Sequence, residues 1–93
     1  MKAAVCRAGI DVHGCGSMDI GGSPNVFVNG YPVHRVGDSE SHGGHQVEGS
    51  STVFANGIAV ARVGDMGAVG EPIPPYHSPN PEATGSPNVF CGG

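Results

Sequence analysis

The sequence predicts a small all-β domain with internal threefold repetition and essentially no helix. Two short elements alternate along the chain, and each occurs three times. The first has the pattern Ser-x-x-Val-Phe and begins at Ser23, Ser50 and Ser86. The second is Arg-Val-Gly-Asp, which begins at Arg35 and Arg62, with a version one residue longer at Arg7. The composition agrees, because 17 glycines, 8 prolines and no tryptophan in 93 residues disfavour helix and suit tight turns.

The order of the two elements predicts a closed structure. The chain opens inside one half-repeat and ends inside the other. Its two ends can therefore complete a repeat between them, which a closed pseudo-trimer requires and an open solenoid does not. We expect one domain over residues 1–93. A chain this short buries a thin core and usually depends on a metal, a disulfide or a partner for stability.

Residues 25–36 and 52–63 are each predicted to form a β-hairpin. Both contain an Asn-Gly pair between two apolar runs, and Asn-Gly readily adopts the positive φ angles that a tight hairpin turn needs. Within the first strand, Val26 and Val28 fall on one face and Phe27 on the other. Cys91 occupies the register of Val28 in the last repeat, so we interpret it as a small, buried apolar residue, and Cys6 likewise.

The third repeat carries a proline-rich insertion within residues 66–84. The repeat serines are 27 residues apart between the first two repeats and 36 between the last two, which leaves nine extra residues there. Prolines in this stretch remove the amide donors that regular strand pairing needs. We expect an ordered loop, because the insertion lies inside the repeat array and carries a histidine, His77.

Charge and cysteine content exclude several classes of protein. The net charge is −4 with four basic residues, too few to follow a phosphate backbone, so nucleic acid is not an expected partner. Residues 1–10 contain neither a signal-peptide pattern nor an apolar span, so synthesis in the cytoplasm is expected. Three cysteines without an export signal argue against a disulfide framework and leave a thiol available for metal.

The repeats resemble the PAAR-repeat family, named for a Pro-Ala-Ala-Arg tetrapeptide that appears here as residues 32–35 and 59–62. The resemblance extends from about Ala3 to Gly93. It implies a sharp β-cone that caps the homotrimeric spike of a type VI secretion system or a contractile phage tail, with one zinc ion near the point. The implied partner is one VgrG-like spike trimer per copy of the chain, with secreted effectors as possible cargo and a target membrane as a transient contact.

The family's zinc is bound by three histidines and a cysteine. Many members carry that cysteine eight residues before the last repeat serine, where this chain has Ser78, and the cysteine in that register here is Cys15. Each repeat places a histidine eight to ten residues before its serine, and such a set can converge on one end of a threefold molecule. Imidazole and thiolate form the closed tetrahedral sites of structural zinc. The expected ligands are His13, Cys15, His42 and His77, with His45 as a competitor of His42.

The remaining candidate residues favour structural interpretations. His34 aligns with Ala61 and is expected to be a surface or packing residue. The aspartates that end the second element, Asp11, Asp38 and Asp65, are expected to cap turns rather than to catalyse. A small zinc hydrolase is the alternative function, but it needs a general base, and Glu40, Glu48 and Glu71 have no evident placement toward the metal. We therefore expect a spike tip without enzymatic activity.

Overall fold

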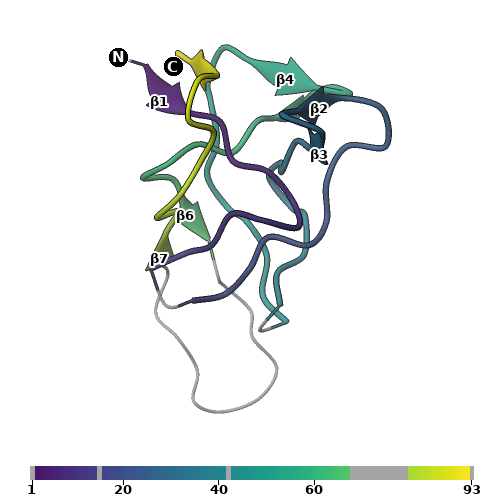
Figure 1. Ribbon diagram of the computed structural model, residues 1–93. Coiled ribbons are helices and arrows are strands. Elements are labelled where there is room, and N and C mark those ends of the chain that lie inside the picture. Colours follow the sequence, from purple (N-terminus) through teal and green to yellow (C-terminus); the bar gives the residue numbers. More distant parts are fainter. Residues whose placement is uncertain (1, 15, 42, 68–79, 93) are drawn as a thin grey trace.

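A computed structural model describes residues 2–14, 16–41, 43–67 and 80–92 as a set of very short, antiparallel strand pairs (Figure 1). Those residues contain no helix, and hence none long and apolar enough to cross a membrane. This confirms the predicted all-β class. The strands are β1 (Ala3–Ala4), β2 (Phe27–Val28), β3 (Tyr31–Pro32), β4 (Phe54–Ala55), β5 (Ile58–Ala59), β6 (Met66–Gly67), β7 (Asn80–Pro81) and β8 (Phe90–Cys91).

The two predicted hairpins are β2–β3 and β4–β5. Asn29 and Gly30 have φ angles of 56° and 84°, and Asn56 and Gly57 have 57° and 76°. Positive φ at both central residues is the turn geometry that matches the twist of paired strands. The hairpin registers are equivalent, with Phe27 opposite Pro32 and Phe54 opposite Ala59. The Asn-Gly signal therefore located both turns correctly.

The two ends of the chain form the third hairpin-like unit. Strand β1 pairs antiparallel with β8, so that Ala3 lies opposite Cys91 and Ala4 opposite Phe90. Figure 1 shows both termini on the same end of the molecule, beside β4. The predicted closure of the repeat array is thus made by strand pairing between residues at opposite ends of the sequence.

A ring of three backbone hydrogen bonds marks the pseudo-threefold axis. The amide of Cys6 donates to the carbonyl of Ala61 (2.9 Å), Ala61 donates to His34 (2.9 Å), and His34 donates to Cys6 (3.1 Å). These three residues each precede an arginine of the second element and have no exposed surface. The equivalence of His34 and Ala61 expected from the sequence is confirmed, and Cys6 is their counterpart in the first repeat.

The Arg-Val-Gly-Asp elements form three ion pairs around this axis. Arg7, Arg35 and Arg62 each donate two side-chain hydrogen bonds to the aspartate that ends the element, with Nε to carboxylate distances of 2.9–3.0 Å. Each aspartate also accepts the backbone N–H of its own arginine. The predicted turn-capping role of the aspartates is confirmed, and the arginine adds a bidentate partner.

The repeat serines join each repeat to a different one. The hydroxyl of Ser86 donates to Asn29 Oδ1 (2.6 Å), Ser23 donates to Asn56 Oδ1, and Ser50 donates to the carbonyl of Gly92 (2.6 Å). Each serine oxygen also accepts the amide three residues later at 2.9 Å. Every hairpin turn is thereby fixed to the start of another repeat, which completes a ring of three.

The apolar core is small and lies at the end of the molecule that carries the termini. It consists of Val5, Val33, Ala55, Val60 and Cys91, flanked by Val28 and Val89. The buried, apolar interpretation of Cys91 is confirmed, and burial raises the pKa of its thiol. At the other end, β6 pairs with β7 and brackets the proline-rich insertion, most of which falls on residues 68–79, outside the described residues.

Candidate metal centre

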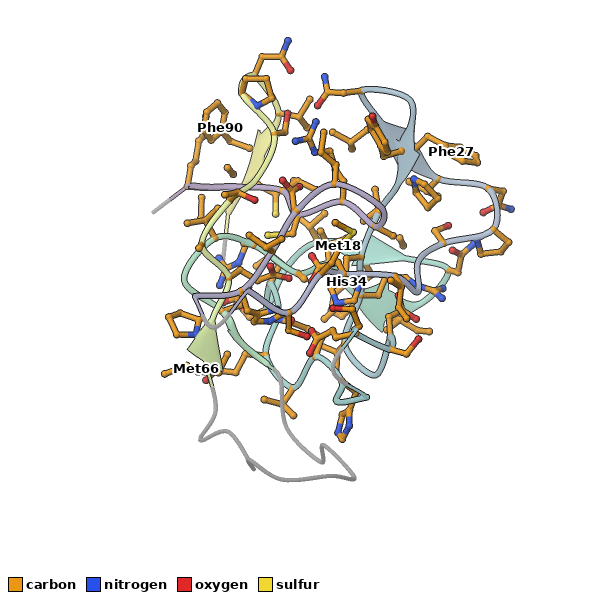
Figure 2. The ribbon with its side chains drawn as sticks, turned by 60° about the horizontal axis from the view of Figure 1, so that its bottom comes forward. Met18, Phe27, His34, Met66 and Phe90 are labelled. Atoms are coloured by element: carbon orange, nitrogen blue, oxygen red, sulfur yellow. The ribbon has the colours of Figure 1, made fainter. Side chains whose placement is uncertain are left out.

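Below the apolar core, the repeat positions nearest the axis carry polar side chains. Two residues after the repeat aspartates stand His13, Glu40 and Gly67, and four residues before the repeat serines stand Asp19, Gln46 and Glu82. All six are buried. Together with His34 in the backbone ring, they form an interior of imidazole and carboxylate groups. Figure 2 shows His34 near the centre of the molecule. We call His13, Asp19, His34, Glu40 and Glu82 the inner cluster.

Both ring nitrogens of His13 face this interior. Nε2 lies 2.9 Å from Oε1 of Gln46 and 3.2 Å from Oε2 of Glu40. Nδ1 lies 3.4 Å from Oδ1 of Asp19 and 3.7 Å from Oε1 of Glu82, and it has no hydrogen-bond partner among the described residues. The ring is 1% exposed. Both ring nitrogens of His13 therefore contact buried residues of the interior.

His34 approaches the same carboxylates from the backbone ring. Its Nδ1 lies 2.7 Å from the carbonyl oxygen of Gly21, which can only accept, so Nδ1 carries a proton. Nε2 then faces Glu40 at 3.2 Å and Asp19 at 3.4 Å. Burial alone lowers the pKa of His34, but the adjacent Glu40 and Asp19 outweigh it and raise the pKa.

Asp19 and Glu82 are the least satisfied groups in the molecule as described. Among the described residues, none of their four carboxylate oxygens has a hydrogen-bond partner at normal distance, although the two carboxyl groups interact with each other, and their exposed fractions are 0% and 2%. Burial is the largest cause that raises the pKa of Asp19 to about 10 and that of Glu82 to about 8. Without a cation nearby, such carboxyl groups hold protons at neutral pH because a buried, unpaired charge is costly.

The donor atoms are close enough together to share one ion. One ligand atom from each of His13, Asp19, Glu40 and Glu82 lies within 4.8 Å of the others. The site is closed on the β6 side by Gly67, where a methyl group would overlap Nε2 of His13 and lie 2.5 Å from Oε1 of Gln46. A side chain at this position would require His13, Gln46 or Glu40 to move. The residues present thus suit a divalent metal ion shielded from solvent.

The sequence-predicted ligands are only partly described. His13 lies in the inner cluster, whereas Cys15, His42 and His77 lie outside the described residues. His45 is exposed and pairs with Ser39 through an isolated bridge. The proposed tetrahedral set therefore stays a prediction.

Three other expectations can be compared with the structure. From the sequence, Glu40 had no evident placement toward a metal, and in the structure it lies beside both imidazoles of the inner cluster, in the group of residues that could hold an ion. Glu48 caps the amide of Met66 at 2.9 Å, and Glu71 lies outside the described residues. His34 was expected to lie at the surface or to pack in the core. It is buried, as the second alternative held, but its Nε2 contacts carboxylates instead of apolar side chains. The sequence does contain a signal for the inner cluster that was missed. Polar residues stand two residues after the repeat aspartates in two repeats and four residues before the repeat serines in all three.

Comparison with known proteins identifies the family. A family model of the PAAR motif matches residues 11–74 and residues 36–93. The chain belongs to the PAAR-motif family. No curated protein matches the sequence. Membership associates the chain with a family of structural, metal-binding spike-tip proteins, and the inner cluster is a buried group that could bind a metal.

Proposed function

We propose that this protein is a non-enzymatic, zinc-stabilised tip that caps the trimeric β-helical spike of a contractile injection machine. The cap sharpens a type VI secretion spike or a phage tail for envelope piercing and offers a platform for effectors. The observation that carries the proposal is the closed pseudo-threefold array, in which three equivalent strand pairs end on one face. A threefold face suits a partner that has three identical chains.

The chemistry of that face supports docking. Its centre is an apolar hollow of about 190 Å³ lined by valines from all three repeats, among them Val5, Val33 and Val60. Phe54 and Phe90 line the hollow and are 57% and 53% exposed, and their counterpart in the first hairpin, Phe27, is 55% exposed. Figure 2 places Phe27 and Phe90 at one end and Met66 toward the other. Large apolar side chains that gather on one exposed face are typical of an interaction surface.

Strand pairing gives a second contribution to docking. Each unit on this face is a two-stranded sheet, so each has edge strands with unpaired backbone groups. A blunt β-structure can continue such edges by β-augmentation. With four basic and eight acidic residues, the chain provides little electrostatic steering, so we expect binding that depends weakly on salt.

Zinc near the point is the metal part of the proposal. We retain His13, Cys15, His42 and His77 as its proposed ligands, with His45 as the alternative member. The amide of Gly14 donates to the carbonyl of Pro81 in β7 (2.9 Å). The segment that follows His13 therefore begins beside β7, which lies away from the termini (Figure 1). A closed ligand set leaves no position for an activated water, which is why a structural role is favoured over hydrolysis.

The test of the capping role is the stoichiometry with a cognate spike trimer. Light scattering of the mixture should give one copy of this chain per trimer, because the exact threefold axis offers one position. Substituting Phe54→Asp together with Phe90→Asp should abolish the complex, since both charges would be buried at the contact. Ile20→Asp is the matched control, because Ile20 is 54% exposed and does not line the hollow. Three copies per trimer would contradict the proposal.

A further inference from the structure

We propose that the inner cluster is itself a divalent cation site, separate from the cysteine-containing site proposed at the tip. Its ligands are carboxylates and imidazoles on the pseudo-threefold axis. The proposal accounts for an otherwise unexplained feature of the fold, namely three acidic side chains buried together in a domain whose apolar core is only a few residues across.

The unpartnered atoms are the first argument. Five buried side-chain atoms lack hydrogen bonds among the described residues: Nδ1 of His13, both carboxylate oxygens of Asp19 and both of Glu82. Buried polar atoms in native proteins are almost always paired, so five in one place indicate a missing partner. The donors converge within 4.8 Å, which is a ligand-to-ligand spacing that one ion can bridge.

The orientation of His34 is the second argument. Its Nδ1 proton is held by the carbonyl of Gly21, so Nε2 is the nitrogen that faces Asp19 and Glu40, and it is hydrogen-bonded to Glu40 at 3.2 Å. A histidine that ligates a metal through one nitrogen commonly donates the other N–H to a backbone carbonyl in the same way. Nε2 of His34 is therefore oriented toward the converging donors, and it could bind an ion there once its own proton is released.

The charge balance is the third argument. Every arginine of the chain is paired with the aspartate of its own repeat element, and Lys2 is exposed at the N-terminal end. Among the described residues, the arginines and Lys2 thus leave Asp19 and Glu82 without a fixed positive charge, and the basic groups beside them are the imidazoles of His13 and His34. A divalent cation would supply that charge in a place where an unpaired carboxylate is costly.

The donor set indicates the class of ion. Oxygen and imidazole donors without sulfur suit Mn²⁺, Fe²⁺ or Zn²⁺. Among the described residues, Cys6 interacts with Glu82 and Asp19; its Sγ–H donates to the carbonyl of Thr84 at 3.3 Å, and burial beside these carboxylates raises its pKa, so it stays a protonated thiol. The inner site is thus distinguished chemically from a tip site that contains Cys15.

The two proposals share one residue, His13. Both of its nitrogens face the inner cluster, so the inner ion takes His13 when both sites are filled. The tip site would then need His45 in place of His13, beside His42 rather than instead of it. The other four residues of the inner cluster belong to the inner site alone.

The experiment counts metal ions in the full chain and in two variants. Wild-type protein loaded with Zn²⁺ should hold two ions. Cys15→Ala should keep only the ion of the inner site, and the double variant Asp19→Asn with Glu82→Gln should keep only the ion of the tip site. In cobalt-loaded protein, thiolate-to-metal absorption should persist in the double variant and vanish in Cys15→Ala. Glu48→Gln is the control, since it removes one carboxylate charge from an exposed turn cap.

Mn²⁺ binding to Cys15→Ala, followed by electron paramagnetic resonance, tests the inner site without altering any of its residues. One tightly bound Mn²⁺ per chain supports the proposal, and its absence from folded protein overturns it. In the double variant, affinity should fall by more than the roughly 10–100-fold that loss of an outer-shell partner costs. An unchanged ion count in that variant would also overturn it. Spike stoichiometry is measured separately, so failure of the capping role would leave these results standing.

Discussion

At the scale of single residues, the axis positions decide what the interior is made of. Cys6, His34 and Ala61 occupy one equivalent position and differ completely in chemistry, yet the backbone ring that joins them is regular. Repetition in the sequence predicted that His34 and Ala61 are equivalent, and the structure adds Cys6 to them. The repetition did not predict that His34 contacts Glu40, because that contact joins two different repeat positions and depends on how the layers stack along the axis.

Gly67 provides a test of how tightly these layers stack. A Cβ at this residue would overlap His13 and lie 3.0 Å from Oε2 of Glu40, so Gly67→Ala should displace the inner cluster. We expect a loss of about 1–3 kcal/mol in the free energy of unfolding, the usual cost of overpacking. Urea denaturation measures it. Gly92→Ala is the control, because its nearest neighbour would be Thr52 Oγ1 at 4.0 Å, and an equal loss in both variants would contradict the packing argument.

At the scale of elements, short-range signals predicted structure well and long-range ones did not. The β2–β3 and β4–β5 hairpins were located because Asn-Gly fixes a turn within four residues. The β6–β7 pair was not predicted, because its strands are separated by the proline-rich insertion and nothing local marks their register. The β1–β8 pair was anticipated only from the incomplete repeats at the two ends of the chain.

The three Arg–Asp elements have the same contacts but different burial, which predicts unequal contributions to stability. The side chains of Arg7 and Asp11 are 8% and 2% exposed, whereas those of Arg35 and Asp38 are 12% and 15% exposed. Asp11→Ala leaves the more deeply buried guanidinium without its partner and should cost about 3–5 kcal/mol. Asp38→Ala should cost roughly 1.5–3 kcal/mol, as for other hydrogen bonds to charged groups. Urea denaturation of both variants would refute this if Asp38→Ala were the more damaging.

At the scale of the whole molecule, closure compensates for a thin apolar core. The core cluster of five buried apolar side chains is too small to stabilise a domain of this size alone. The repeats are instead tied to one another by serine–asparagine contacts, by hydrogen bonds from the arginines to residues of other repeats, and by the β1–β8 pair. The threefold plan was visible in the sequence, whereas the carboxylate-rich interior was not, because burial of charged residues runs against their usual place at the surface.

The dependence of such a molecule on metal should be large and reversible. An ion bound only by the folded state adds about 4 kcal/mol of stability when its concentration is 1,000 times the dissociation constant. A chelator should therefore lower the melting temperature steeply, and added Zn²⁺ should restore it in proportion to the logarithm of its concentration. Calorimetry over a series of Zn²⁺ concentrations measures this. The Asp19→Asn with Glu82→Gln variant should respond less than the wild type, because one of its two sites is gone, whereas Cys91→Ala should respond fully, since that thiol lies in the apolar core. A melting temperature that changed with neither chelator nor added metal would show that the buried carboxyl groups hold protons and that the fold is stable without an ion.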